Sequence, residues 1–240
     1  MNKLLIITAI LFVPSLLLAD KVWVGGQTHE GQVKYKNGRI EIKTDAGATV
    51  KVDVSQVQNI STKRPSSVRS LEKATPADII KKAPALLKDP EIKMLAWSKH
   101  VGYLLARAYM SQGKFQQAID AVKNVQFDMN RAPEDAIVDK TKLASILIAG
   151  YARTKRLREA DTEFKKIKVR GSSVDSYTFY ASGEIMEAKG KKTEALLEYF
   201  KSIYFPGSKK SLGRRDAISR VVVIYKGLGD ARADKFASMK

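Results

Sequence analysis

The chain has 240 residues, with 43 Lys and Arg against 25 Asp and Glu, a formal net charge of +18 and no cysteine. Without cysteine there are no disulfide bonds and no cysteine-linked lipid anchor, so stability has to come from buried apolar area. A surface this basic attracts polyanions through its electrostatic field.

Residues 1–19, MNKLLIITAILFVPSLLLA, have the layout of a secretory signal peptide: a basic start, an apolar run interrupted by Pro14, and a small residue, Ala19, at the end. The run is shorter than the roughly 20 residues that a membrane-spanning helix needs. We predict cleavage after Ala19 and export to the periplasm or cell envelope. Retention of the segment as an N-terminal anchor is the alternative.

From residue 20 to residue 60 apolar and polar residues alternate, as in RIEIK and TVKVDV. Turn residues separate these runs, and Asn37-Gly38 is the strongest hairpin signal because both residues tolerate positive φ. The stretch from Gly26 to Val52, GQTHEGQVKYKNGRIEIKTDAGATVKV, resembles the Sm-like and SH3-like small barrels. We therefore predict a small all-β barrel over 20–60.

A serine-rich, basic segment with no apolar periodicity follows, and we predict a flexible linker over 61–72. After it the apolar period changes to 3.6, and Thr75-Pro76 and Asp89-Pro90 are typical of helix starts. Short turns separate the remaining helical segments. The predicted fold class is thus multidomain, an N-terminal all-β barrel plus an all-α domain over 73–240.

The helical part contains an internal repeat. Tyr109 precedes Ala118 by nine residues, and the same spacing joins Tyr151 to Ala160 and Met186 to Ala195; Tyr225 precedes Asp234 by nine, with Ala233 one residue earlier. Gly113, Gly190 and Gly229 stand four residues after the first member, where Lys155 replaces glycine in the second copy. A glycine there can close the first helix in a left-handed conformation, and a small alanine lets the second helix approach. The repeat predicts stacked helical hairpins.

These residues resemble the tetratricopeptide repeat, whose pattern is Leu-Gly-x-x-Tyr followed by Ala-x-x-x-Phe. The copies here are Leu105-Ala106-x-x-Tyr109 with Ala118-x-x-x-Val122, Leu147-Ile148-x-x-Tyr151 with Ala160-x-x-x-Phe164, and Ser182-Gly183-x-x-Met186 with Ala195-x-x-x-Tyr199. The resemblance covers roughly residues 90–240 and implies an α-α solenoid. An irregular α-bundle with Tyr and Ala in its core is the alternative.

The resemblance also implies a concave groove that holds a protein or peptide. Helix phase predicts Tyr103, Arg107, Lys142, Arg153 and Tyr180 as its partner-binding residues, with His100, Ser145, Tyr177 and Glu184 beside them. Some family members clamp a carboxylate with Lys, Arg and Asn, which Arg107, Lys142 and Arg153 partly match. The alternative is that these are solvated residues of an ordinary helix face.

A second candidate surface is the basic cluster of Arg153, Lys155, Arg156 and Arg158. Lys165, Lys166, Lys168 and Arg170 lie at the end of the following helix, where the helix dipole explains them. The dipole does not explain the first four residues, so we predict that they contact a polyanion.

The sequence offers little for catalysis. His29 and His100 have no partner at metal-binding spacing, and phosphate-binding glycine motifs are absent. We interpret Glu134, Asp135 and Asp139 as helix-capping residues. We therefore predict no enzymatic activity, no cofactor and no metal.

Two functions remain open. The first is an exported scaffold that binds another envelope protein through a helical groove. The second is a binder of envelope polysaccharide or anionic lipid; nucleic acid is less favoured because surface aromatics are not interleaved with the basic residues.

Overall fold

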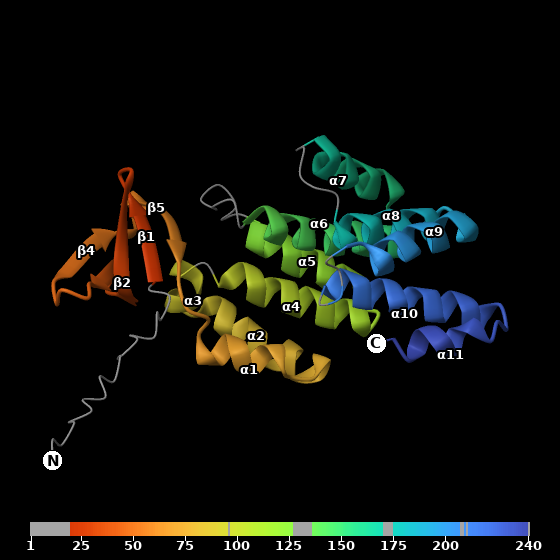
Figure 1. The fold of residues 1–240 in the computed structure, drawn as a ribbon, viewed down its shortest axis with the longest axis horizontal. Helices are drawn as coiled ribbons and strands as arrows, with labels where there is room; N and C mark the ends of the chain where they lie inside the picture. Colours follow the sequence, from red (N-terminus) through yellow and green to blue (C-terminus); the bar gives the residue numbers. More distant parts are fainter. Residues whose placement is uncertain are drawn as a thin grey trace, which may run out of the picture. The chain divides into compact units, whose positions relative to one another are not determined.

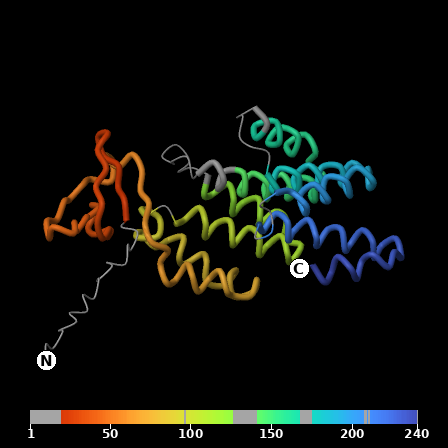
Figure 2. Tube along the Cα trace, viewed as in Figure 1, coloured from red at the N-terminus to blue at the C-terminus, as the bar shows by residue number. Residues whose placement is uncertain are grey.

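The computed structural model describes residues 20–95, 97–126, 136–169, 175–206, 209 and 211–239. They belong to two compact units that divide between Lys63 and Arg64, an N-terminal antiparallel sheet and a helical unit (Figures 1 and 2). The signal-peptide prediction for 1–19 and the capping interpretation of Glu134 and Asp135 lie outside the described residues.

The first unit is a five-stranded antiparallel sheet with the order β4-β3-β2-β1-β5. Its elements are β1 (Asp20–Val24), β2 (Gln27–Lys36), β3 (Arg39–Lys43), β4 (Thr49–Asp53), the 3-10 helix η1 (Val54–Gln56) and β5 (Val57–Ser61). The predicted hairpin is confirmed, since Asn37 and Gly38 have φ of 50° and 80° between paired Lys36 and Arg39. As the alternating pattern predicts, one set of apolar side chains is buried: Val22, Val33, Ile40, Ile42, Val52 and Ile60.

The prediction of a closed barrel is wrong, because β4 and β5 are the two edges of an open sheet. The long strand β2 pairs with β1 over 27–31 and with β3 over 32–36. Gly31 marks this change of partner, and an added Cβ there would lie 2.3 Å from the carbonyl oxygen of Lys43. Alternation specifies which face is buried but not whether the outer strands meet, and here β5 pairs with β1.

A helix occupies most of the segment predicted to be a linker. The helix α1 (Ser66–Glu72) buries Val68 and Leu71, which are three residues apart and so share one face. Arg64 pairs with Glu72 at its end, at 2.8 Å. The linker prediction over 61–72 is therefore wrong from Ser66 onward. One apolar pair in a serine-rich segment is too short to give a periodicity signal.

The rest of the described chain is helical, as predicted. The helices are α2 (Pro76–Lys88), α3 (Pro90–Met94), α4 (Ser98–Ser111), α5 (Phe115–Gln126), α6 (Ala136–Arg153), α7 (Leu157–Val169), α8 (Ser176–Ala188), α9 (Lys192–Tyr204), α10 (Leu212–Gly227) and α11 (Arg232–Ala237). The side chains of Thr75 and Asp89 accept hydrogen bonds from backbone amides of α2 and α3. Both predicted helix starts are confirmed.

From α4 onward the helices pack as the antiparallel hairpins α4-α5, α6-α7, α8-α9 and α10-α11 (Figure 1). Their first helices also contact one another in chain order, α4 with α6, α6 with α8 and α8 with α10. The alanines of the repeat, Ala118, Ala160, Ala195 and Ala233, are all buried on the second helices. The sequence repeat therefore corresponds to a repeated packing unit.

Each hairpin turn closes in the same way. Gly113, Lys155, Gly190 and Gly229 have φ of 70°, 62°, 78° and 68°. The next amide donates to a carbonyl five residues earlier in all of them: Lys114 to Tyr109, Arg156 to Tyr151, Lys191 to Met186 and Asp230 to Tyr225, at 2.8–2.9 Å. This is the bonding of a left-handed helix C-cap. The predicted role of the glycines is confirmed, and Lys155 adopts the same conformation.

Candidate functional site: a cleft along the first helices

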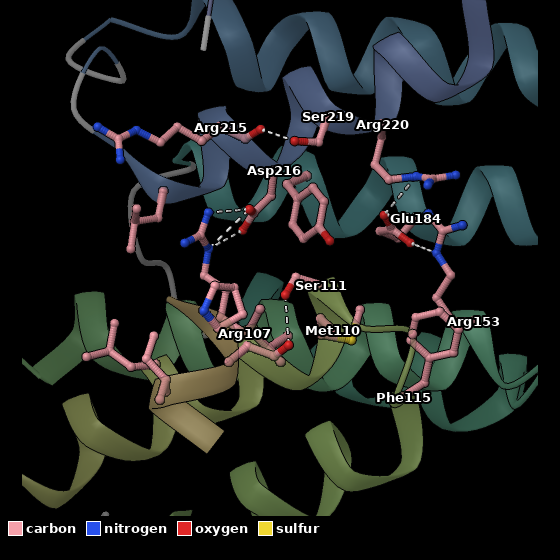
Figure 3. A pocket seen from close by; sticks show the side chains of 18 of the residues that line it. Arg107, Met110, Ser111, Phe115, Arg153, Glu184, Arg215, Asp216, Ser219 and Arg220 are labelled. Carbon is pink, nitrogen blue, oxygen red and sulfur yellow. Dashed lines mark hydrogen bonds and ion pairs between the residues drawn. The ribbon is translucent and has the colours of Figure 1, made fainter. Parts of the chain in front are cut away.

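The helical unit contains a cleft of about 840 Å³, lined by residues of α1, α2, α4, α6, α8 and α10, of the turns that follow α1 and α4, and of the start of α5 (Figure 3). Part of its wall is apolar, with Ile79, Leu104, Met110, Phe115, Ile146 and Val223. The lining also includes charged side chains of both signs: Glu72, Arg107, Arg153, Glu184, Arg215, Asp216 and Arg220. Because α4, α6 and α8 are the first helices of consecutive hairpins, the repeat itself forms one side of the cleft.

An ion pair joins the first and last hairpins across this cleft. The Arg107 guanidinium on α4 donates from Nε to Asp216 Oδ2 at 3.0 Å and from Nη2 to Asp216 Oδ1 at 2.6 Å. Burial opposes the charge of Arg107, but the Asp216 carboxylate on α10 outweighs it, so the pKa of Arg107 is raised. Arg107 is therefore already occupied by a carboxylate of its own chain.

A second charged group connects α6, α8 and α10. Arg153 holds Glu184 through two bonds, from Nε at 2.6 Å and from Nη2 at 2.8 Å, and the Glu184 side chain is only 1% exposed. Glu187 accepts hydrogen bonds from Arg153, from Arg220 and from the Tyr199 hydroxyl. A buried carboxylate is stable when it is paired and hydrogen-bonded in this way.

The pKa shifts in this group follow from these contacts. Burial disfavours the charge on Arg153, but Glu184 and Glu187 together raise its pKa. Burial pushes the pKa of Glu187 upward, and the hydrogen bond from Arg220 and the charges of both arginines more than compensate, so it lies below its usual value. At neutral pH the cleft thus holds fixed charges of both signs.

Part of the predicted groove is in the cleft and part is not. His100, Arg107, Arg153, Tyr180 and Glu184 line it. The Nε2 atom of His100 lies 2.6 Å from the Oε1 atom of Glu72 on α1. These residues come together because α4, α6 and α8 present corresponding faces.

Other predicted groove residues lie elsewhere. Tyr103 is buried at 2% exposure, and its hydroxyl has no hydrogen-bond partner among the described residues. Ser145 and Tyr177 are also buried outside the cleft, and the Lys142 ammonium lies 6.0 Å from the centre of the Tyr177 ring. Helix α4 packs against α2, α5 and α6, so residues one position off its apolar stripe are covered as well.

The structure divides the predicted polyanion cluster. Arg153 lies in the cleft with two glutamates. Arg156 pairs with Glu159 at 2.8 Å and covers the Tyr151 ring at 4.6 Å from its centre. Lys155 and Arg158 are exposed and make no ion pair with a described residue. The cluster is therefore not one continuous free surface.

Sequence reasoning missed Glu187 and the charged residues of α10. Arg215, Asp216 and Arg220 line the cleft, and Asp216 and Arg220 are four residues apart on one helix face. The signal was present, because charged residues interrupt an otherwise apolar segment, DAISRVVVIY. The repeat pattern does not point to these residues, because the last copy departs from it, with Asp234 at the alanine position.

Within the described residues, no three His, Asp or Glu side chains gather as a metal-binding group. No described helix is long and apolar enough to cross a membrane. Comparison of the chain with protein-family models, with curated proteins and with solved structures finds no match.

Proposed function

We propose that this protein is an exported, non-enzymatic scaffold. In this proposal the helical unit is a tetratricopeptide-like superhelix that holds a segment of a partner protein in the cleft. The observation that carries it is the recurrence of one hairpin, with one turn closure, whose first helices contact in chain order beside a cleft of about 840 Å³. Stacked helical hairpins form extended concave surfaces of this kind.

The lining indicates what kind of segment fits. Three of its arginines, Arg107, Arg153 and Arg220, are already paired with carboxylates of the same chain. Arg215 is exposed and makes no ion pair with a described residue, so it alone could meet a ligand carboxylate freely. At the other three arginines a ligand carboxylate would have to displace the carboxylate of the same chain, which leaves a buried charge unpaired and costs about 3–5 kcal/mol. An apolar or amphipathic segment would instead contact the uncharged wall, so we favour it over a carboxylate clamp.

The test is capture of a partner from envelope extract by the immobilised protein, with the retained proteins identified by mass spectrometry. Val223 is suited to the mutation because it lines the cleft and is 51% exposed, so Val223→Glu adds a charge without disturbing the core. The matched control is Leu197→Glu on α9, at a side chain that is 55% exposed outside the cleft. We expect Val223→Glu to reduce capture about tenfold or more, as for the loss of a central interface contact.

Unchanged capture by Val223→Glu, or equal loss with Leu197→Glu, would contradict binding in the cleft. Capture that survives high salt is part of the expectation, because an apolar contact is not screened.

Export is a separate part of the proposal. Strand β1 begins at Asp20, the residue after the predicted cleavage site. Its carboxylate accepts hydrogen bonds from the backbone amides of Val33 at 3.1 Å and Lys63 at 2.6 Å, so the first residue of a cleaved chain would be anchored in the sheet. The intact mass of protein purified from the envelope of source cells tests this. A mass that includes residues 1–19 would contradict cleavage and support an anchor.

A second candidate function, binding of an anionic polymer, is favoured by exposed basic residues outside the cleft. Those residues belong to the hairpin turns.

A further inference from the structure

In Figure 1 each hairpin turn lies at the right-hand end of its own helix pair, and the α8-α9 and α10-α11 turns reach farther right than the α4-α5 and α6-α7 turns, so the turns form a staggered edge. We call this surface the turn edge and define it as residues 112–114, 154–158, 189–192 and 226–232. It holds nine basic residues and one acidic residue, Asp230. The repeat places these charges along the same edge, because every first helix runs toward the turn edge and every second helix runs away from it (Figure 1).

Carboxylates of the same unit neutralise part of the charge. Ion pairs are formed by Arg156 with Glu159, Lys189 with Asp161, Lys191 with Glu194 and Arg232 with Asp230. The remaining basic residues of the turn edge are exposed and make no ion pair with a described residue: Lys114, Lys155, Arg158, Lys192 and Lys226. Each of the hairpins contributes at least one of them.

We infer that the turn edge binds an acidic polysaccharide. The first helices of neighbouring hairpins pack on one another, so the free cations are distributed over four consecutive turns and are not gathered at one point. Long, flexible Lys and Arg side chains distributed in this way suit a flexible polymer that repeats its anionic groups. The cleft has a different character, since Arg107, Arg153 and Arg220 are paired with carboxylates and part of its wall is apolar, so the two surfaces call for different partners.

The turns also indicate that the polymer has no bases. Two aromatic rings beside the turns are covered by the edge's own arginines, Tyr151 by Arg156 at 4.6 Å and Tyr225 by Arg232 at 4.5 Å, and the Phe115 side chain, next to Lys114 in the chain, lines the cleft. Neither ring is available to stack on a nucleotide base, which single-stranded nucleic-acid sites use. Leu228 is the only large apolar side chain of the turn edge that is well exposed, at 57%, and one such residue is ordinary for a protein surface. These features favour polysaccharide over nucleic acid or a membrane.

The test is the affinity of the purified protein for heparin over a salt series, with single-stranded DNA and phosphatidylglycerol vesicles as comparison probes. The edge variant changes Lys114, Lys155, Arg158, Lys192 and Lys226 to Gln. The control variant makes the same change in net charge on α2, α3 and the turn after α1, with Lys73, Lys81, Lys82, Lys88 and Lys93 changed to Gln. All of the control residues are exposed, and none forms an ion pair with a described residue.

We expect the edge variant to bind heparin at least about tenfold more weakly and to reduce the magnitude of the slope of log K against log salt by up to about 3.5, since each of the five lost contacts to a flexible polyanion contributes about 0.7. The control variant should keep most of the slope. Circular dichroism melting verifies that both variants are folded. Val223→Glu should leave heparin binding unchanged, which separates this inference from the cleft proposal.

Equal losses in the two variants would show that net charge rather than the turn edge attracts heparin, and would overturn the inference. Tighter binding to single-stranded DNA or to the vesicles, with the same dependence on the edge residues, would overturn the choice of polysaccharide.

Discussion

At the residue scale, the feature that the four hairpins share most clearly is a positive φ angle at the residue that closes the first helix. The position that closes each first helix is left-handed in every hairpin, and in the second hairpin a lysine occupies it, with φ of 62°. A residue with a Cβ has a steric cost in this conformation that glycine does not have. The backbone of Lys155 is therefore strained, and the surrounding turn holds it in this conformation.

Lys155→Gly should raise the free energy of unfolding by about 1 kcal/mol, because glycine removes that steric cost. The measurement is chemical denaturation at equilibrium. The reciprocal control is Gly190→Lys, at a position where an added Cβ meets nothing within 4 Å, so only the backbone conformation is penalised. It should lower stability by a similar amount. A destabilised Lys155→Gly protein would contradict this account of the turn.

Glu187 should make stability depend on pH. Its pKa is lowered in the folded protein from an ordinary value of 4.5. The carboxylate therefore contributes stability above about pH 4.5, and this contribution is lost as the pH falls from there through the lower folded pKa. We expect Glu187→Gln to cost about 2 kcal/mol at pH 7 and progressively less below pH 4.5. Denaturation at a series of pH values checks this, and a cost that is the same at pH 7 and pH 3 would exclude it.

Residue patterns could be predicted from the sequence where the cause is local. The left-handed glycines, the buried alanines and the Asn37-Gly38 hairpin all follow from neighbours within about ten residues, and the structure confirms them. The cleft depends on contacts that are distant in the chain. Arg107 could be placed on a helix face, but its partner Asp216 is 109 residues away, and no local pattern connects the two.

At the element scale, α10 is the helix that decides the chemistry of the cleft. It contributes Asp216 to Arg107 of α4 and Arg220 to Glu187 of α8, and it packs directly against α8 and α9. The last hairpin thus supplies charges that complete those of the earlier ones. Helix α1 shows that a short local pattern can also be insufficient for prediction. Its composition resembles a linker, but it forms a helix that buries two apolar residues, Val68 and Leu71.

A double-mutant cycle on Arg107→Ala and Asp216→Ala should measure the coupling between α4 and α10. We expect each single variant to lower the free energy of unfolding by about 2 kcal/mol, and the double variant to lose about 1–2 kcal/mol less than the sum. The side chains are only partly exposed, at 31% and 20%, so the pair is weakly screened by solvent. Simple additivity of the two changes would mean that the ion pair does not couple these helices.

At the scale of the whole molecule, the two units differ in how much apolar surface they bury. Among the described residues, the sheet unit has six buried apolar side chains, whereas those of the helical unit form two extended clusters. A domain as small as the sheet unit buries a smaller fraction of its surface on folding than a larger domain does, and it is only marginally stable by itself. The open edges of β4 and β5 add unpaired backbone groups that a closed barrel would have satisfied.

The sheet should therefore open at a lower free energy than the helices. Native-state hydrogen exchange on the full chain measures both, because amides in units of different stability exchange through separate opening reactions. We expect the slowest amides of β1 and β3 to exchange well before those of α6 and α8. Ile42→Ala should then accelerate exchange in the sheet alone, and Ile119→Ala in α5 should affect the helical unit alone, because each side chain is fully buried within its own unit. Acceleration of both units by either change would mean that they unfold as one cooperative structure, and the sheet would then be an integral part of the scaffold rather than a separate module.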